Sequence, residues 1–318
     1  MRKIWLGLVL GFLLTSVGWA AGNPPEKPLR VGTLSGITGL AMVRLMEPAG
    51  TAAPYEITVY KSPDLLVAKL VAGEVDLAAL PLNTAAILYN KGVGVQITSV
   101  IGWGVLYVVA GDRRIKRWSD LKGKEIYLSA KGTVPDLLFR YLAAKNGLTA
   151  ERDFTIHYLT SPVELAQLAA SGKADLAVLP EPWVTEVVER NRQLRVVLDL
   201  QREWRRTERQ SLTYPQSSLV ASKKALAAAP QAVEGFLKSL AASIRWVNRQ
   251  PQAAGALAEK YVQINAGAVE RGIKRCNLKY VAAAKVQTEI NRFLERLGEK
   301  TPEAIGGKLP DEGFYYQP

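Results

Sequence analysis

Two short loops of small residues are where a ligand could approach the backbone of this 318-residue chain most closely. Ser35 to Gly39 follows the apolar run Leu29 to Leu34. Ser129 to Thr133 follows a second such run, Glu125 to Leu128. Glycine lets backbone N–H groups reach a ligand, although either loop alone could be a plain strand-to-helix turn. Because the two loops occupy equivalent places, we expect a binding role for Ser35, Gly36, Thr38, Ser129, Gly132 and Thr133.

Two further segments follow prolines that close apolar runs. Asn83 and Thr84 come after Pro81, and Glu181-Pro182-Trp183 comes after Pro180. Ligands of open α/β sheets bind beyond the carboxyl ends of strands, so these segments are also candidates. Asn83 and Thr84 are equally well explained as helix caps. A carboxylate at Glu181 would repel a bare oxyanion but accept hydrogen bonds from a ring amine or hydroxyl.

Three aromatic residues are candidate contacts for a flat ligand. Trp103 stands between two glycines at the end of an apolar run, and we favour it over Trp183 as a stacking platform. Tyr214 precedes Pro215 and is expected either to pack at a hinge or to contact the ligand. The single His157 and single Cys276 exclude a metal site of the His/Cys type, and no cofactor is expected.

An internal repeat predicts the elements that position these residues. Residues 71–81 and 170–180 share glycine, aspartate and a closing proline at the same spacing, and the match extends back to residues 55 and 154. Each copy reads as strand, Ser-Pro helix start, helix, glycine stop and strand, which is typical of a right-handed βαβ unit. The sequence therefore predicts an α/β fold with two similar lobes, and treats the repeated glycines and aspartates as structural.

The order of the elements places one lobe within the other. We expect residues 28–111 and 214–318 to form the first lobe and residues 112–213 the second, with chain crossings near Gly111 and Tyr214. The predicted strands include 95–101, 105–110 and 218–222, and residues 202–210 are expected to be a polar surface stretch. From Lys224 onward the pattern is helical, with helices predicted at 230–248, 251–262, 266–273 and 281–297. Two crossings form a hinge, and the cleft between the lobes is the expected ligand site.

The N-terminus has the pattern of a secretory signal peptide. Arg2 and Lys3 precede the apolar run Ile4 to Leu14, and small residues near Ala20 predict cleavage, so residues 1–21 are assigned to the signal. The run is shorter than a membrane span, and the absence of a cysteine there argues against a lipid anchor. We expect a periplasmic, monomeric protein. The net charge of +12 could attract anionic ligands or membrane headgroups, but a basic solvated surface is the favoured reading. No basic-aromatic cluster indicates nucleic-acid binding.

The chain resembles the periplasmic substrate-binding proteins of ABC importers, in the branch that binds aliphatic sulfonates, nitrate and thiamine pyrimidines. The signal peptide, the paired Gly-x-x-Asp-Leu-Ala-x-Leu-Pro segments, Trp118 to Ile126, the Glu181-Pro182 turn and Ile305 to Pro310 carry the resemblance. It implies a type II two-lobed fold that closes on a small molecule and delivers it to an inner-membrane permease.

Three kinds of function remain open at this point. A binding protein is favoured, with a heteroaromatic vitamin precursor slightly preferred over a sulfonate-like anion as ligand because of Trp103, Trp183 and Glu181. The alternative is an enzyme of the thiamine-pyrimidine synthase type, but it needs an active-site histidine, and His157 is expected within a strand. A related deaminase fold would need a cofactor-bearing cysteine near the cleft. An extracytoplasmic sensor domain is the third reading.

Overall fold

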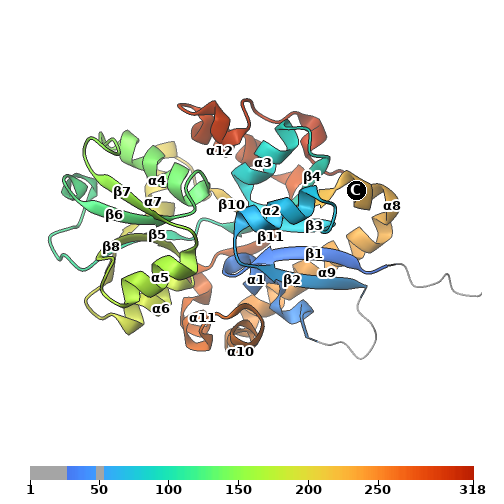
Figure 1. The fold of residues 1–318 in the computed structure, drawn as a ribbon, viewed down its shortest axis with the longest axis horizontal. Helices are drawn as coiled ribbons and strands as arrows, with labels where there is room; N and C mark the ends of the chain where they lie inside the picture. Colours follow the sequence, from blue (N-terminus) through green and yellow to red (C-terminus); the bar gives the residue numbers. More distant parts are fainter. Residues whose placement is uncertain (1–26, 48–53) are drawn as a thin grey trace, which may run out of the picture.

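Two β-sheets with helices packed around them form two lobes in the computed structural model, which describes residues 27–47 and 54–318 (Figure 1). The two lobes are joined by a hinge, and a helical region follows the last long strand of the first sheet. The prediction of a two-lobed α/β fold is therefore confirmed. The predicted signal peptide, residues 1–21, lies outside the described residues.

The first sheet has six strands in the order β11-β4-β10-β3-β1-β2. Strand β1 pairs in parallel with both β2 and β3, whereas β10 runs antiparallel to β3 and β4. The carboxyl ends of β1, β2 and β3 therefore meet at one edge. The strands are β1 (Leu29–Leu34), β2 (Tyr55–Tyr60), β3 (Leu77–Pro81), β4 (Val95–Trp103), β10 (Pro215–Ser222) and β11 (Leu278–Ala282).

The second sheet repeats this arrangement with five strands in the order β7-β6-β8-β5-β9. Here β6 is the strand between two parallel partners, and β5 runs antiparallel to β8 and β9. The strands are β5 (Leu106–Ala110), β6 (Glu125–Ser129), β7 (Thr155–Leu159), β8 (Leu176–Pro180) and β9 (Arg195–Asp199).

The internal repeat appears as two copies of one βαβ unit. Helix α2 (Pro63–Val71) connects β2 to β3, and α5 (Pro162–Ala170) connects β7 to β8. The Ser62 and Ser161 side chains cap these helices by accepting hydrogen bonds from backbone N–H groups at 3.3 and 3.2 Å. Both predicted units are thus present, with helix starts set by the same Ser-Pro pair.

The chain crosses between the lobes earlier than expected. Strand β5 pairs with β8 and β9 in the second sheet, so the first crossing lies at Gly104-Val105 and not near Gly111. The second crossing follows Tyr214, where β10 begins. Gly104 has φ +22°, and a Cβ there would lie 2.2 Å from Thr213 Oγ1, so the two crossing segments pack too tightly for a side chain. The sequence pattern could not reveal this because both strands that flank the crossing are equally apolar.

Helices cover both sheets. The helix predicted over residues 281–297 begins later, because β11 adds an edge strand at Leu278–Ala282. Most of the stretch 202–210, expected to be polar surface, lies in α7. The remaining helices are α1 (Ile37–Met42), α3 (Leu82–Asn90), α4 (Val134–Lys145), α6 (Trp183–Arg190), α7 (Leu200–Glu208), α8 (Lys223–Ala228), α9 (Pro230–Arg249), α10 (Pro251–Val262), α11 (Ala266–Gly272) and α12 (Gln287–Gly298), with short 3-10 turns that include η2 (Trp118–Leu121), η3 (Ile273–Arg275) and η5 (Pro302–Ile305).

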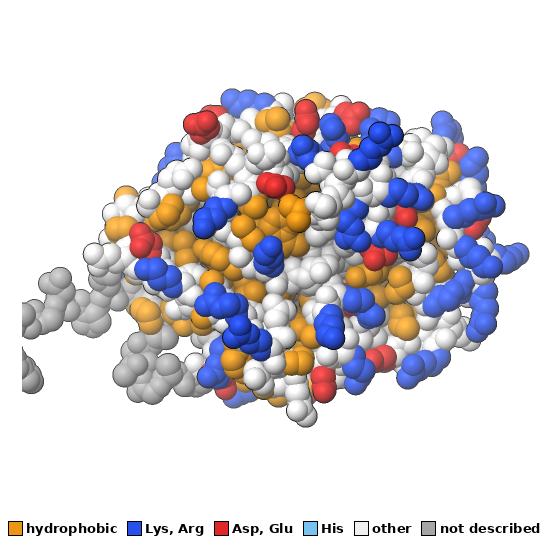
Figure 2. Space-filling model, turned by 180° about the vertical axis from the view of Figure 1, so that it is seen from behind, with side chains coloured by type: hydrophobic (Ala, Val, Ile, Leu, Met, Phe, Trp, Pro, Cys, Tyr) orange, Lys and Arg blue, Asp and Glu red, His pale blue; other side chains and the backbone are white. Residues whose placement is uncertain are grey.

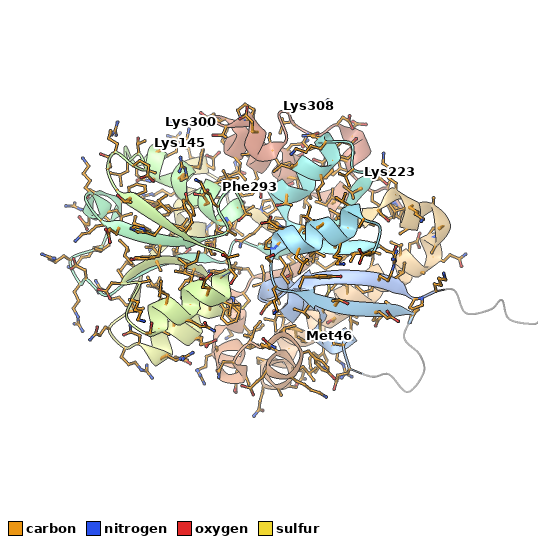
Figure 3. All side chains as sticks on the ribbon, in the orientation of Figure 1. Met46, Lys145, Lys223, Phe293, Lys300 and Lys308 are labelled. Atoms are coloured by element: carbon orange, nitrogen blue, oxygen red, sulfur yellow. The ribbon has the colours of Figure 1, made fainter. Side chains whose placement is uncertain are left out.

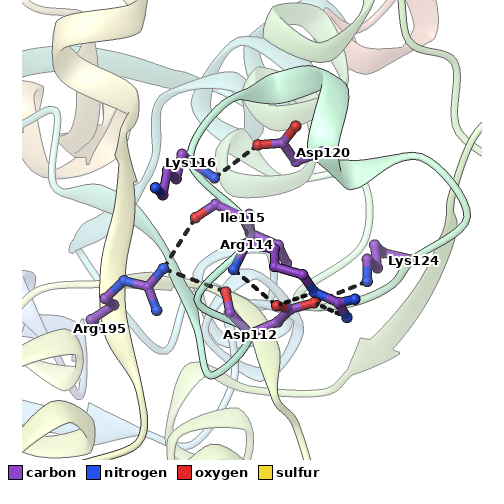
Figure 4. Close-up of polar contacts among 7 residues, drawn as sticks. All are labelled: Asp112, Arg114, Ile115, Lys116, Asp120, Lys124 and Arg195. Atoms are coloured by element: carbon purple, nitrogen blue, oxygen red, sulfur yellow. Dashed lines mark hydrogen bonds and ion pairs between the residues drawn. The ribbon is translucent and has the colours of Figure 1, made fainter.

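Hydrogen bonds from charged side chains fix the segment that follows β5 on the surface of the second lobe. In the segment between β5 and η2, the Asp112 carboxylate accepts hydrogen bonds from Arg114 and Lys124 (Figure 4). The hydrogen bond from Arg114 makes the largest contribution to lowering the pKa of Asp112, and the one from Lys124 lowers it further. Arg195 holds the same segment by donating to the carbonyl groups of Asp112 and Ile115.

Lys and Arg outnumber Asp and Glu across the rear face of the molecule, in line with the net charge (Figure 2). Within residues 27–47 and 54–318, no helix is long and apolar enough to cross a membrane.

Candidate ligand-binding cleft

A cavity of about 110 Å³ lies between the two lobes, at the edge where the carboxyl ends of the parallel strands face one another. The first lobe contributes the segments that follow β1, β2 and β3, and the second lobe contributes those that follow β6, β7 and β8. We call this cavity the cleft. Its polar lining residues are Ser35, Gly36, Thr38, Lys61, Ser129, Thr133, Ser161, Trp183, Gln216 and Ser217.

On the second-lobe wall, two buried donors have no partner among the described residues. Ser129 ends β6 and is 1% exposed, and Trp183 begins α6 and is 3% exposed. Neither the Ser129 hydroxyl nor the Trp183 indole N–H forms a hydrogen bond within the described chain. A buried donor left without a partner costs about 1–3 kcal/mol, so both groups are suited to a ligand that accepts hydrogen bonds.

On the first-lobe wall, the backbone at Gly36 faces the same indole. Gly36 has φ +110° and ψ −151°, which only glycine adopts easily, and a Cβ there would lie 3.7 Å from Trp183 Nε1. Ser35 donates a hydrogen bond to the carbonyl of Val262 at 2.7 Å, and the Thr38 hydroxyl lies 3.2 Å from the carbonyl of Leu34. These two hydroxyl groups fix the loop, and they leave the glycine backbone turned toward the cleft.

The electrostatics of the cleft favour negative charge. Three helices of nine residues or more, α2, α4 and α5, begin at its wall, and the positive ends of their dipoles therefore point inward. No side chain caps α4 at Thr133, but the buried Asp136 carboxylate in its first turn accepts a hydrogen bond from the Gly132 N–H at 2.9 Å. The first turns of α2 and α5 also carry a carboxylate each and are capped by serines, so the three helix dipoles are partly offset. Lys61 is the one charged residue among the described residues that line the cleft, and no carboxylate lies among them.

Asn83 and Gly132 form a contact between the lobes. The Asn83 amide is fully buried and donates to the carbonyl of Gly132 at 2.9 Å and to that of Ala304 at 3.1 Å. Thr84 follows in α3 and is not part of the cleft lining. These residues lie beside the cleft and join its two walls.

Glu181, Trp103 and Tyr214 do not line the cleft. Glu181 is fully buried and accepts hydrogen bonds from Thr185 and, at 2.6 Å, from Arg275 Nε. Its charge is therefore satisfied by the protein, and its side chain gives no reason to expect a ring donor as ligand. The Trp103 indole donates to the carbonyl of Lys279 at 3.1 Å on the hinge side of the first sheet.

Tyr214 is fully buried at the second crossing. Its hydroxyl donates to Gln201 Oε1 at 2.5 Å, and its ring stacks on Phe293 at a centroid distance of 5.4 Å. Burial raises the pKa of Tyr214 well above its usual value. Its side chain therefore packs at the hinge.

The sequence analysis missed four polar residues of the lining. Lys61 and Ser161 lie at the starts of the two repeat helices, so the repeat itself contained the signal for them. Gln216 and Ser217 begin β10 at the second crossing. The Gln216 side chain accepts a hydrogen bond from the Val105 N–H at 3.3 Å, which ties the two crossings together.

The two groups that an enzyme on this fold would use lie elsewhere. His157 is on β7, where it stacks on Tyr127 at 5.0 Å, and it does not line the cleft. Cys276 is fully buried beyond η3, and burial raises the pKa of its thiol well above the usual value. A thiol held in its protonated form is a poor nucleophile. Among the described residues, no cluster of His, Cys, Asp and Glu could hold a metal ion.

The fold and the cleft together define a two-lobed periplasmic binding protein. Residues 46–262 match the family described as "ABC transporter, phosphonate, periplasmic substrate-binding protein", and the chain belongs to this family. Membership implies an extracytoplasmic location. No curated protein matches the sequence.

Solved structures of binding proteins share the fold. A crystal structure of an ABC transporter from Parabacteroides distasonis is 28% identical with a TM-score of 0.77, covering 92% of this chain and 99% of that one. The aliphatic sulphonate binding protein SsuA of Escherichia coli is 17% identical with a TM-score of 0.70, covering 92% and 93%. The nitrate-binding protein NrtA of Synechocystis is 13% identical with a TM-score of 0.70, covering 89% and 85%.

Proposed function

We propose that this protein captures a small oxyanion-bearing molecule, such as a phosphonate or sulfonate, and delivers it to an ABC permease. The observation that carries the proposal is the pair of unpartnered buried donors, Ser129 and Trp183, in a cleft without carboxylates. An oxyanion accepts hydrogen bonds from both groups and gains from the helix N-termini and from Lys61.

Two further features favour an oxyanion over a heteroaromatic vitamin precursor. Glu181, which had favoured a ring donor, is bonded to Arg275 and lies outside the cleft lining. The family description and the sulphonate- and nitrate-binding neighbours support the same ligand class.

The proposal also covers where the protein acts and in what oligomeric state. The cleavable signal peptide at residues 1–21 would direct the chain to the periplasm, and the protein would act as a monomer. The enzyme alternative has less support, because His157 and Cys276 both lie outside the cleft lining.

Titration calorimetry with methylphosphonate, methanesulfonate and the neutral dimethyl sulfone tests the ligand class. We expect one of the two anions to bind and the sulfone not to bind. Ser129→Ala should weaken anion binding by about 1.5–3 kcal/mol, the range for a hydrogen bond to a charged group. Ser171→Ala is the matched control, because that hydroxyl donates to Leu168 on the exposed end of α5. Equal binding of sulfone and anion would overturn the proposal.

A further inference from the structure

A second cavity, of about 190 Å³, lies at another part of the boundary between the lobes. Helix α4 begins at the cleft, and the C-terminal half of the same helix forms one wall of this second cavity. The opposite wall is the end of α12 with the residues that follow it. We call it the α4–α12 pocket.

The inner surface of the α4–α12 pocket is apolar. Leu148 and Leu297 are 2% and 5% exposed, and Leu137 packs against the same core. Ala144 and Ala150 complete this surface. An apolar cavity of ~150 Å³ holds benzene, so this pocket has room for about one aromatic ring.

The rim of the pocket is strongly cationic. Arg140, Lys145, Arg296 and Lys300 line it, and Glu299 is its one carboxylate among the described residues. Lys145 and Lys300 both lie where α4 approaches the end of α12 (Figure 3).

Only part of this positive charge is neutralised within the protein. Arg296 pairs with Glu208 at 3.0 Å, and Lys145 lies 3.5 Å from Glu299. Arg140 and Lys300 form no ion pair with any residue in the described part of the chain, although the Arg140 side chain also contacts the Tyr158 hydroxyl. Cations left unpaired beside an apolar surface match a ligand that has both an anionic group and an apolar body.

We propose that the α4–α12 pocket is a second binding site, which takes a monocyclic aromatic carboxylate. The ring would lie against the leucine side chains, and the carboxylate would contact Arg140 and Lys300. This site is separate from the cleft, and it does not depend on the identity of the cleft ligand. Because its walls come from both lobes, a bound molecule would contact both lobes at once.

Fluorine NMR with 4-fluorobenzoate as the probe tests the proposal on the full mature chain. We expect saturable binding to the wild type and much weaker binding of the neutral 4-fluorobenzyl alcohol. Arg140→Glu with Lys300→Glu should lower the affinity at least about tenfold, which corresponds to ~1.4 kcal/mol. The matched control is Lys223→Glu with Lys308→Glu, which reverses two exposed lysines outside the pocket and should change nothing.

Two further variants separate this pocket from the cleft. Ala144→Phe should fill the pocket and abolish probe binding, with its thermal midpoint measured to show that it folds. Trp183→Ala alters the cleft and should leave probe binding unchanged. The proposal is overturned if the wild type shows no saturable binding, if the double charge reversal binds like the wild type, or if Trp183→Ala abolishes probe binding.

Discussion

Trp183 is the residue whose substitution reports most directly on the ligand. Its indole N–H faces the cleft without a protein partner, whereas the Trp103 indole already donates to the Lys279 carbonyl. Trp183→Phe keeps an aromatic ring but removes the donor, so binding of the anion should weaken by about 1.5–3 kcal/mol. Trp103→Phe should leave affinity unchanged and lower stability. Calorimetry and thermal melts of both variants test this, and equal affinity losses would count against the assignment of the cleft.

Glu181 makes a contribution to stability that is distinct from ligand binding. Its carboxylate is fully buried, whereas the Arg275 side chain is 47% exposed, so solvent can partly take over the arginine charge if the carboxylate is removed. Glu181→Gln should therefore lower the free energy of unfolding by about 1–3 kcal/mol and leave ligand affinity nearly intact. Urea unfolding measures the loss, with Glu186→Gln, which removes a pair within α6, as control. A large change in affinity at unchanged stability would contradict this role.

Individual residues were predictable where the signal was local. Ser129 and Thr133 line the cleft as expected, because a loop after a parallel strand must lie at that edge of the sheet. Trp103 and Tyr214 also end or precede strands, but neighbouring segments cover them, and the sequence does not say which segments these are. The pairing of Glu181 with Arg275 joins residues 94 positions apart, which no local pattern reveals.

At the scale of elements, Asp76 ties the turn before β3 to the neighbouring strand β1. Its carboxylate accepts hydrogen bonds from the Arg30 backbone N–H at 3.0 Å and from the Arg30 guanidinium at 2.7 Å. Burial raises the pKa of Asp76, but its contacts with Arg30 outweigh burial and hold the pKa below the usual range. The repeated aspartate of the second copy, Asp175, instead packs against Gly111.

A lowered pKa in the folded state makes this contribution pH-dependent. Deprotonated Asp76 stabilises the fold above the pKa of the unfolded chain, near 3.9, and the contribution is lost as the pH falls through the lower folded pKa. Asp76→Asn should cost about 0.5–1 kcal/mol at pH 7, since Arg30 is half exposed, and the cost should shrink toward pH 3. Thermal melts from pH 7 to pH 3 measure this, and a cost that is independent of pH would contradict it.

The repeat predicted both βαβ units, because Ser-Pro starts and glycine stops are strong local signals. The position of β5 and the presence of β11 were not predictable in the same way. An apolar strand fits either sheet, and β11 is a short edge strand that pairs irregularly with β4. Sheet membership depends on long-range pairing, which a single sequence does not encode locally.

At the scale of the whole molecule, contacts on both sides of the boundary join the two lobes in the described structure. On one flank, Arg271 and Arg275 pair with Glu189 and Glu181 of the second lobe. On the other side of the boundary, the Asn83 amide reaches the carbonyl of Gly132. If the lobes open and close about the hinge, an open form would have to break these contacts.

Removing the two arginines should shift the ligand-free protein toward the open form. We expect Arg271→Ala with Arg275→Ala to have a larger radius of gyration than the wild type without ligand, as measured by small-angle scattering. Saturating ligand should return it to the wild-type value. Affinity should fall in proportion to the fraction of the protein that remains closed, because the apparent dissociation constant is the intrinsic one divided by that closed fraction.

The control for this prediction removes two arginines whose pairs stay within the second lobe. Arg152 pairs with Asp153 and Arg190 with Glu186, so Arg152→Ala with Arg190→Ala changes the net charge equally without touching the boundary. This control should scatter like the wild type in both states, because neither lobe is released from the other. If the radius of gyration increases equally in both double variants, the loss of positive charge causes the expansion, and the loss of contacts between the lobes does not. If neither expands, the hinge and the aromatic packing of Tyr214 on Phe293 are enough to hold the lobes together.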